Sequence, residues 1–277
     1  MQQAKVWWIT GASSGIGAAL ADCLSQAGAS VILSGRNRAR LDQVAHRVKT
    51  PALVLPFEAT DYSALPDITA KAWAWAATQG ANLHGLINNA GVSQRSLAVE
   101  TAFEVYQQIV AIDLLAPIAL TQAVLPRMVA AGGGHIVAIS SVAGILDAPL
   151  RSAYSAAKHG LIGYHDSIRA ETAHQGIQVL VVAPGSVATD VSRNALGANA
   201  RARGVSDPAI DSGMPADVAA ACIVEAIDTG KRELILAEGA EAEAARLRRA
   251  NPDLLFDMMA KLVASGYVEA LGANAKS

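Results

Sequence analysis

Short apolar runs alternate with longer segments of helical pattern along most of this chain. The apolar runs, which are rich in Val, Ile and Leu, lie at residues 6–10, 31–33, 53–57, 85–87, 135–139, 177–182 and 233–236. Runs of this length and composition are typical of strands in a parallel sheet that is covered on both faces. Alternation of such strands with helices predicts right-handed βαβ crossovers. We therefore expect an α/β fold: a Rossmann-like, doubly wound, seven-stranded parallel sheet with helices on both faces.

The same pattern predicts how the chain is divided. We expect one large α/β domain at residues 1–238 and a helical extension at 239–277. Residues 190–214 are polar and rich in Gly, Ala and Arg, so we interpret them as a mobile substrate lid. A long apolar helix should span residues 102–130, with a kink at Pro117, which lacks a backbone donor.

The extension carries an apolar stripe at helical spacing. Its residues are Leu254, Leu255, Met258, Met259, Leu262 and Val263. The stripe favours packing on the domain or on a sister subunit. A membrane-associated helix is the less favoured alternative.

A glycine-rich turn joins the first strand to the first helix. Its residues are Thr10-Gly11-Ala12-Ser13-Ser14-Gly15-Ile16-Gly17. Gly11 permits the tight turn, Gly15 allows backbone to approach a pyrophosphate, and Gly17 allows the helix to pack closely on the strand. The amino terminus of the helix faces the anion, and the two serines and the isoleucine lie beside it. The position between a strand and a helix makes this turn a strong prediction of a dinucleotide site.

The end of the second strand indicates which dinucleotide binds. A carboxylate there would accept hydrogen bonds from the adenosine ribose and repel a 2′-phosphate. Gly35 occupies this place and Arg36 follows it. Because a guanidinium is a good bidentate partner for phosphate, the sequence favours NADP(H) over NAD(H). The alternative is that Arg36 is a solvated surface residue.

A hydroxyl, a phenol and an ammonium converge after the fifth strand. Ser141 lies where that strand ends, and Ser152 can cap the helix that follows. Tyr154 and Lys158, four residues apart, project from one face of this helix. An ammonium close to a phenol, whose reference pKa is about 10, favours the phenolate. Tyr154 can then exchange a proton with an oxygen that Ser141 holds, although the same spacing is commonplace on helices without a catalytic role.

Four motifs resemble those of the short-chain dehydrogenase/reductase family in order and separation. They are residues 10–17, Asn88-Asn89-Ala90-Gly91, the spacing of Ser141, Tyr154 and Lys158, and Pro184-Gly185. The resemblance covers residues from about 4 to 237. Residues 192–196 and 231–234 are similar to a subgroup of these reductases, which is related to dehydrogenase/reductase member seven and to the steroid and retinoid carbonyl reductases.

The resemblance implies four catalytic residues. Tyr154 acts as acid and base, Lys158 lowers its pKa and holds the nicotinamide ribose, and Ser141 orients the carbonyl. The fourth position, which is normally Asn in the family, is Asp113 here. Its backbone carbonyl can still hold a water that belongs to a proton relay. Its carboxyl, however, must be either paired with a cation such as Lys158 or protonated.

The resemblance also implies cofactor contacts outside the glycine turn. Those of the adenosine half are Arg36, Glu58 (where the family has Asp), Asn89 and Ala90. Those of the nicotinamide half are Tyr154, Lys158, Pro184, Gly185, Val187 and Thr189. In this family the residue at Glu58 contacts the adenine amino group and the backbone at Val187 meets the carboxamide.

The predicted substrate contacts are mostly apolar. They are Ser141, Val142, Tyr154, Gln94 and Val191, with further wall residues at Val92, Leu150, Val187 and Leu196. Such a wall favours a medium or large hydrophobic ketone. Arg95 could meet an anionic group or lie at the surface.

Composition argues against several other classes of function. The formal net charge is −2 and no basic block occurs, which argues against nucleic acid and anionic membrane surfaces as partners. Nothing at the amino end resembles a signal peptide, and no apolar run reaches the about 18 residues that span a bilayer. We therefore expect a cytoplasmic protein in which Cys23 and Cys222 are buried thiols. No metal site is predicted.

The function that the sequence favours is NADPH-dependent reduction of a carbonyl, or the reverse oxidation of a secondary alcohol. Two alternatives remain open: an NAD-linked alcohol dehydrogenase or imine reductase on the same site, and a non-catalytic protein that senses NADP. We expect a homodimer or homotetramer that associates through the helices near residues 102–130 and 152–175.

Overall fold

The computed structural model describes residues 4–146 and 148–268 and contains one sheet of seven parallel strands. The strands are β1 (Val6–Thr10), β2 (Ser30–Ser34), β3 (Ala52–Val54), β4 (Leu83–Asn88), β5 (Gly134–Ile139), β6 (Ile177–Pro184) and β7 (Glu233–Leu236). Their order is β3-β2-β1-β4-β5-β6-β7, so the chain winds outward in both directions from the boundary between β1 and β4. This order confirms the predicted doubly wound fold and places its switch point, where such folds bind ligands, at that boundary.

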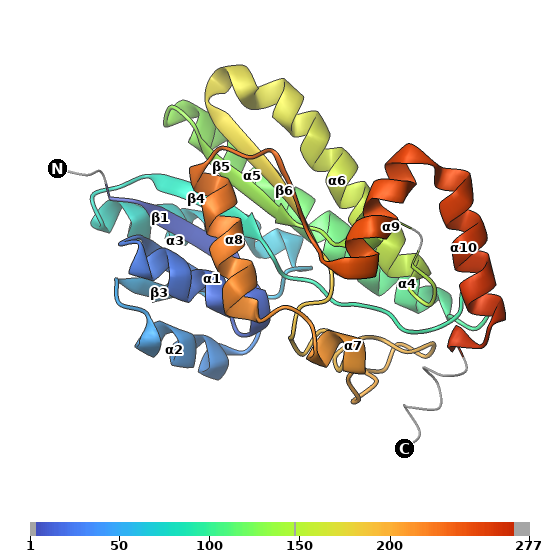
Figure 1. The fold of residues 1–277 in the computed structure, drawn as a ribbon. Coiled ribbons are helices and arrows are strands. Elements are labelled where there is room, and N and C mark those ends of the chain that lie inside the picture. The colour runs from blue at the N-terminus through green and yellow to red at the C-terminus, as the bar shows by residue number, and fades with distance from the viewer. Residues whose placement is uncertain (1–3, 147, 269–277) are drawn as a thin grey trace.

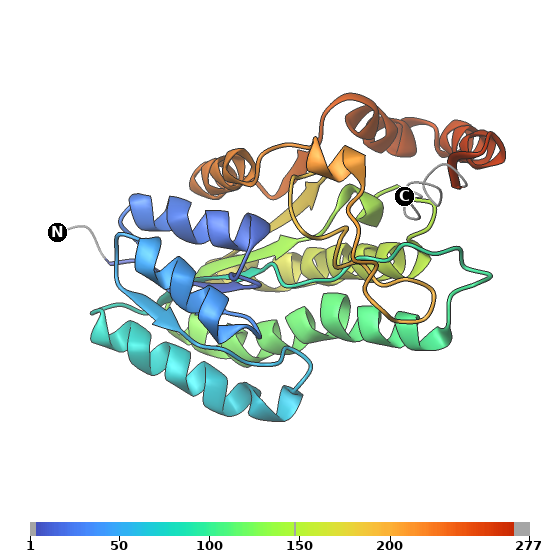
Figure 2. The ribbon, with the colours of Figure 1, turned by 90° about the horizontal axis from the view of Figure 1, so that it is seen from below.

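Helices cover both faces of the sheet. The α-helices of the described residues are α1 (Gly15–Gln26), α2 (Arg38–Arg47), α3 (Leu65–Thr78), α4 (Phe103–Val110), α5 (Ala116–Ala130), α6 (Ser152–Thr172), α7 (Pro208–Asp211), α8 (Ala216–Asp228), α9 (Gly239–Ala250) and α10 (Pro252–Ala264). Figures 1 and 2 show α1, α2 and α8 on one face and α3, α5 and α6 on the other. The result is a three-layer α/β domain.

Residues of β1 contribute to both cores, because successive side chains of a strand point to opposite faces. Trp7 packs in the core beneath α1 and α8, whereas Trp8 packs in the core beneath α3 and α5. All five residues of β1 are buried. A strand that is buried on both faces has no polar alternation, which explains why the strands could be recognised as continuous apolar runs.

The third strand is shorter than its apolar run. We predicted residues 53–57, but β3 ends at Val54. Leu55 still donates to the Leu33 carbonyl and Phe57 to the Gly35 carbonyl, whereas Pro56 between them has no N–H to donate. The ladder therefore loses regularity at Pro56.

The long apolar helix is interrupted just before Pro117. Between α4 and α5 the chain forms a π-helical turn, Ala111–Leu115, with Asp113 at its centre. In an α-helix, residue 117 would donate to the carbonyl of residue 113, and proline has no N–H for this bond. The predicted kink is thus a widened turn that begins several residues before the proline.

This interrupted helix also corrects an expectation about length. Residues Phe103–Ala130 form one helical stretch that is long and apolar enough to cross a membrane, with a mean hydropathy of 1.9 in its best window. The prediction that no apolar run reaches this length was therefore wrong. Asp113 lies in the middle of the stretch, and Leu120, Val124 and Met128 pack in the core beneath the sheet.

The segment predicted as a lid contains more hydrogen-bonded structure than its sequence indicates. It includes α7, and Leu196 forms bridges with Gln94 and with Ala202. Leu196 donates to the Ser93 carbonyl at 2.8 Å and accepts from the Arg95 N–H at 2.9 Å. Backbone hydrogen bonds to residues 93–95 thus hold this segment in place, although its sequence lacks the hydrophobic periodicity of a helix or strand.

The described part of the extension consists of α9 and α10, which lie beyond the carboxyl ends of the strands (Figure 1). Leu255 is buried against Val142 and Leu146, which follow β5. The other face of α10 leaves Leu254, Met258 and Leu262 exposed. The predicted apolar stripe therefore packs on the domain only in part, and residues 269–277 lie outside the described residues.

Candidate active site

The glycine turn follows β1 at the switch point of the sheet. Gly11 and Gly15 have φ angles of +65° and +54°, which side chains rarely adopt. A Cβ on Gly17 would overlap the Gly11 carbonyl, so the helix can approach the strand only with glycine there. The Ser14 side chain makes no capping hydrogen bond to α1. In the described part of the chain the amino terminus of α1 thus has no cap from the Ser14 side chain, which fits a bound pyrophosphate.

The segment after β4 holds this turn in place. Asn89 donates from its side-chain amide to the Thr10 carbonyl at 3.0 Å. The backbone N–H groups of Asn89 and Ala90 donate to the Thr10 hydroxyl at 3.0 and 3.1 Å. The Asn88 side chain instead donates to the Thr121 hydroxyl on α5 at 2.9 Å. The motif at 88–91 thus fixes the glycine turn on one side and a covering helix on the other.

The predicted adenosine end is open to solvent. Arg36 and Glu58 lie 3.9 Å apart, with side-chain exposures of 80% and 46%. Gly35 lies beside them, where an added Cβ would meet the Ser13 hydroxyl at 3.7 Å. The Glu58 carboxylate also accepts from the Thr60 N–H at 3.3 Å. An exposed guanidinium next to the glycine turn fits the 2′-phosphate of a dinucleotide.

Lys158 is fixed to the end of β5. Its ammonium donates to the Ile139 carbonyl at 3.0 Å, and the Ser140 hydroxyl donates to the Lys158 carbonyl at 3.0 Å. The same ammonium lies 5.6 Å from the centroid of the Tyr154 ring. Ser141, the next residue after Ser140, is therefore held in the same region as the phenol and the ammonium.

The Ser141 hydroxyl is buried and makes local hydrogen bonds. It accepts from the Ala143 N–H at 3.1 Å and donates to the Pro184 carbonyl at 3.4 Å. The second contact links the loop after β5 to the last residue of β6, and the loop that follows β6 carries Gly185, Val187 and Thr189. The hydroxyl that we predict to hold the substrate oxygen and the predicted nicotinamide turn are thus neighbours.

Asp113 forms an ion pair with Lys158 inside the domain. Its Oδ2 lies 3.1 Å from Lys158 Nζ, and the side-chain exposures are 0% and 4%. Its Oδ1 accepts from the Val92 N–H at 2.8 Å. Of the two states that the sequence allowed for this carboxyl, the geometry favours the one that is paired with Lys158.

Burial and pairing act in opposite senses on the two groups. Burial raises the pKa of Asp113, and the effects of Lys158 and of the Val92 N–H, which lower it, are smaller. For Lys158, burial alone would lower the pKa, but Asp113 and Tyr154 together raise it above its ordinary value. Asp113 therefore helps to keep Lys158 charged in an apolar environment.

Gly91 makes room for this ion pair. A Cβ at this position would lie 2.7 Å from Asp113 Oδ2 and 3.3 Å from Lys158 Nζ. We did not predict a role for Gly91 from the sequence, although its place at the end of the Asn-Asn-Ala-Gly motif was a usable signal. Because Ala90 touches the glycine turn and Gly91 touches the ion pair, the two parts of the site adjoin.

The amino terminus of α6 corrects two predictions. Ser152 is the first residue of α6 and does not cap it; its hydroxyl bonds the Tyr106 hydroxyl at 2.8 Å. The Ala153 N–H instead donates to Gln94 Oε1 at 2.7 Å, and the Gln94 side-chain amide donates to the Ser96 hydroxyl. Gln94 is fully buried. Gln94 therefore positions the start of α6, whereas we predicted from the sequence that it contacts substrate.

Arg95 is neither a surface residue nor open to an anion. Its guanidinium pairs with Asp207 at 2.6 Å, with side-chain exposures of 6% and 7%, and Asp207 also pairs with Arg203 at 2.7 Å. Burial, followed by the neighbouring Arg151 cation, lowers the pKa of Arg95 to about 10 against the opposing effect of Asp207. The ion pair joins the predicted lid to the segment after β4.

Several predicted wall residues gather near Tyr154. Val92 and Leu196 pack in the same cluster as the Tyr154 ring. Val142 lies in the turn after Ser141, and Val191 is half-buried within the predicted lid. Leu150 has a φ of +66°, a strained value for a side-chain-bearing residue, and lies two residues before α6.

Other predicted cofactor contacts lie in the loop after β6 and in the glycine turn, which follow the carboxyl ends of β6 and β1. Val187 is buried and pairs with Met214. Thr189 lies against the glycine turn, since a Cβ on Gly15 would meet its methyl group at 2.9 Å. Ile16 packs at the edge of the core beneath α1. The loop after β6 and the glycine turn thus face each other, although about 170 residues separate them in sequence.

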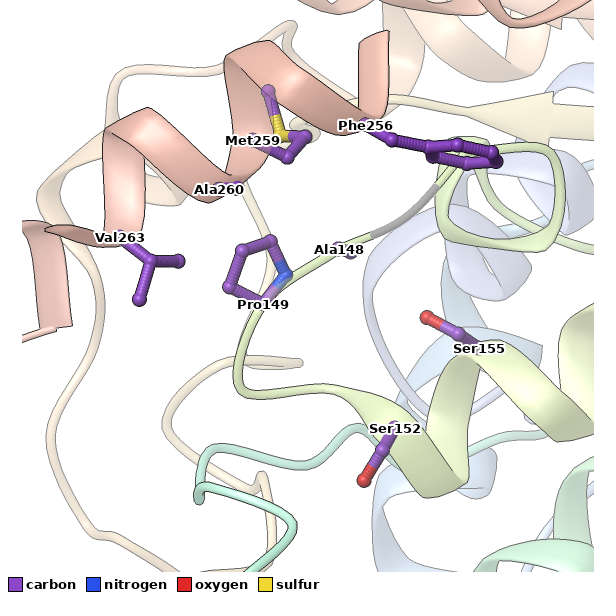
Figure 3. A pocket seen from close by; sticks show the side chains of 8 residues that line it. All are labelled: Ala148, Pro149, Ser152, Ser155, Phe256, Met259, Ala260 and Val263. Atoms are coloured by element: carbon purple, nitrogen blue, oxygen red, sulfur yellow. The ribbon is translucent and has the colours of Figure 1, made fainter. Parts of the chain in front are cut away.

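An apolar pocket of about 700 Å³ lies between α10 and the start of α6 (Figure 3). Its lining residues are Ala148, Pro149, Ser152, Ser155, Phe256, Met259, Ala260 and Val263. The Ser155 hydroxyl has no hydrogen-bond partner among the described residues. Tyr154 lies between the two serines in the first turn of α6, so the pocket adjoins the helix that carries the predicted proton donor.

Comparisons with known proteins agree with this arrangement. Residues 5–199 match the family model described as short chain dehydrogenase. A Danio rerio protein named Dehydrogenase/reductase SDR family member 7B is 38% identical over 269 residues, which span 93% of this chain and 85% of that protein.

Two solved structures extend the likeness to the fold. A short-chain dehydrogenase from Streptomyces avermitilis is 29% identical with a TM-score of 0.77, and the match covers 96% of this chain and 98% of that one. A short-chain dehydrogenase from Sphingobium yanoikuyae in complex with NADPH is 27% identical with a TM-score of 0.74, covering 91% and 96%. By motif, geometry and likeness over most of its length, the chain belongs to the short-chain dehydrogenase/reductase family of oxidoreductases.

Proposed function

We propose that the protein is an NADPH-dependent carbonyl reductase that also catalyses the reverse oxidation of a secondary alcohol. The observation that supports this most strongly is the buried Lys158 ammonium, fixed to the end of β5 and 5.6 Å from the Tyr154 ring centroid. Asn89 and Ala90 donate hydrogen bonds to Thr10 of the glycine turn, and the next residue, Gly91, lies against Lys158 Nζ, so a dinucleotide held by that turn would extend toward this pair.

In the proposed reaction NADPH, when bound, supplies hydride to the carbonyl carbon. Tyr154 donates its phenolic proton to the carbonyl oxygen as negative charge develops there. The Lys158 ammonium stabilises the charge that Tyr154 then carries, and the Ser141 hydroxyl turns from the Pro184 carbonyl to the substrate oxygen. Reprotonation of Tyr154 can use water at the Asp113 backbone carbonyl.

The preference for NADPH rests on the adenosine end. Gly35 and the exposed Arg36 offer a cation where a carboxylate would repel the 2′-phosphate. Glu58 is 3.9 Å from Arg36 and tempers this charge, but both side chains are exposed and therefore weakly coupled. The Sphingobium yanoikuyae relative, which was solved with NADPH, supports the same choice.

For the substrate we propose a hydrophobic ketone. The residues that pack near Tyr154, among them Val92 and Leu196, are apolar. The pocket between α10 and α6 is lined by Pro149, Phe256 and Met259 as well (Figure 3). These surfaces favour an apolar body beside the reacting carbonyl.

The test is the variant Tyr154→Phe, which removes one oxygen and keeps the ring. We expect kcat for a ketone substrate to fall by about a thousandfold, because the proton donor is lost. Binding of NADPH, followed by fluorescence titration, should stay close to that of the wild type. Substantial remaining turnover would remove Tyr154 from the reaction.

The buried ion pair favours one alternative enough to test it. Asp113 compensates the charge of Lys158, and such compensation could suit a protein that binds NADP without turning over. A wild-type protein that binds NADPH tightly but reduces no carbonyl and oxidises no alcohol or amine in a broad panel would favour this sensor. Turnover of any ketone would exclude it.

A further inference from the structure

The loop after β6 is held from outside by a residue of the C-terminal extension. Glu241 lies in the first turn of α9. Its Oε2 accepts from the Ser186 N–H at 2.8 Å, and its Oε1 accepts from the Ser186 hydroxyl at 3.0 Å. One carboxylate thus satisfies both donors of a residue that lies 55 positions away.

The same carboxylate covers Gly185. A Cβ on Gly185 would overlap Glu241 Oε2 and would lie 3.0 Å from the Ala237 Cβ, so the contact exists only because this residue is glycine. Gly185 also donates its N–H to the Leu236 carbonyl at 2.8 Å, which continues the pairing of β6 with β7. Hydrogen bonds therefore hold the turn that precedes Val187 at two successive residues, Gly185 and Ser186.

The remaining side of the turn is held by the segment after the predicted lid. Met214 donates to the Ser186 carbonyl at 2.9 Å, and Ala188 donates to the Met214 carbonyl at 2.9 Å. Ser186 is thus bonded through its N–H and hydroxyl to Glu241 and through its carbonyl to Met214. Of these partners, only Glu241 carries charge, and hydrogen bonds to a carboxylate are about twice as strong as neutral ones.

Helix α9, which carries Glu241, is itself fixed against the other reactive loop. Ala245 on α9 packs with Val142 and Leu146, which follow Ser141. The extension therefore contacts the loops after β5 and after β6 together. A change in the position of α9 alters both.

We propose that Glu241 is a positioning residue for the nicotinamide end of the cofactor. It fixes Ser186, and through Ser186 it fixes the turn from Pro184 to Val187. The inference rests on the proposed function, because it takes this turn to be the one that meets the nicotinamide. It extends that function by making the C-terminal extension part of the cofactor site.

The experiment compares Glu241→Ala with Glu243→Ala. Glu243 lies on the same helix and is exposed, and among the described residues its ion-pair partner is Arg246 of its own helix, at 3.6 Å. Fluorescence titration measures the Kd for NADPH and for adenosine 2′,5′-bisphosphate, which carries the adenine half without the nicotinamide. We expect Glu241→Ala to weaken NADPH about tenfold, because two charge-assisted hydrogen bonds are lost. It should leave the bisphosphate unchanged, and Glu243→Ala should change neither.

Two further variants keep the test independent of folding. Glu241→Gln retains one acceptor for the two Ser186 donors, so we expect a rise of about threefold in the Kd for NADPH. Ser186→Ala removes one donor, and in a double-mutant cycle its effect should shrink once Glu241 is already Ala. Additive effects would show that Glu241 does not act through Ser186.

The outcomes separate this inference from the proposed function. A wild-type protein that binds no NADPH defeats the proposed function itself. If the wild type binds NADPH and Glu241→Gln binds it equally well, only the role of Glu241 is overturned. Equal weakening of NADPH and of the bisphosphate would show a general structural effect and would also overturn the role.

Discussion

The two ends of the proposed dinucleotide site hold their charges in opposite ways. At the adenosine end, Arg36 and Glu58 lie 3.9 Å apart with exposures of 80% and 46%. At the nicotinamide end, Lys158 and Asp113 lie 3.1 Å apart with exposures of 4% and 0%. The first pair is screened by solvent and contributes little to stability, whereas the second has lost its hydration and depends on its partner.

This contrast shows where the site can change and where it cannot. A solvated guanidinium is free to leave its neighbour and meet a phosphate, so the residues around it can set cofactor preference without a cost to folding. A buried ammonium is tied to the fold, so the residues around it affect chemistry and stability together.

Removal of the buried cation should have the largest effect. Lys158→Met leaves the Asp113 carboxylate buried without its ion-pair partner, and we expect a loss of about 3–5 kcal/mol in the free energy of unfolding. Turnover should fall by about a thousandfold or more. Denaturant unfolding and steady-state kinetics measure the two effects.

The double variant Lys158→Met/Asp113→Leu serves as the control for this prediction. It should recover most of the stability but none of the activity, because both buried charges are gone. By comparison, Arg36→Ala should leave stability unchanged. A Lys158→Met protein as stable as the wild type would contradict the division between the two ends.

A matched pair of glycines tests the space at each end. Gly91→Ala places a methyl group 2.7 Å from Asp113 Oδ2 and should displace the ion pair, with a fall of about tenfold in kcat. Gly35→Ala at the adenosine end places its methyl group 3.7 Å from its nearest neighbours and should change kcat by less than about twofold. Equal effects of the two substitutions on kcat would contradict the proposed difference between the two ends of the site.

Cofactor preference should respond to the exposed end alone. Arg36→Gln keeps a polar side chain but removes the charge that would meet the 2′-phosphate. We expect the KM for NADPH to rise about tenfold while the KM for NADH stays the same. Comparable efficiency of the wild-type enzyme with both cofactors would overturn the proposed preference.

The subtlest effect concerns pH. Asp113 raises the pKa of Lys158 against the effect of burial, so Asp113→Asn should lower that pKa. Lys158 then loses its proton at a lower pH, and the alkaline limb of the kcat profile should move toward neutral pH. If the wild type and Asp113→Asn gave the same profile, the carboxylate would be a bystander.

Much of the fold and part of the site could be predicted because the signals are local. The strands of the sheet appear as apolar runs, and the glycine turn and the spacing of Tyr154 and Lys158 lie within short stretches of sequence. The π-helical turn at Asp113 could not be located, because Pro117 shows only that regularity fails upstream. Local pattern fixes which elements form but not every detail of their ends.

The contacts that were missed join residues far apart in sequence. Gln94 caps a helix 59 positions away, and Arg95 pairs with Asp207 across 112 positions. Glutamine and arginine are usually exposed, so their burial follows only once the partner segments are in place. The Glu241 contact with Ser186 belongs to the same class.

The short segment that follows β4 has a consequence for how this protein can vary. Asn89 donates to the glycine turn and Gly91 leaves room for the ion pair. Gln94 caps α6, and Arg95 forms an ion pair with the segment after β6. Loops usually tolerate changes of length, but here a single inserted or deleted residue would displace these four side-chain and backbone contacts at once. The length of this connection is therefore constrained. Replacing it with another loop between β4 and α4 should disrupt the site even where the rest of the domain is left intact.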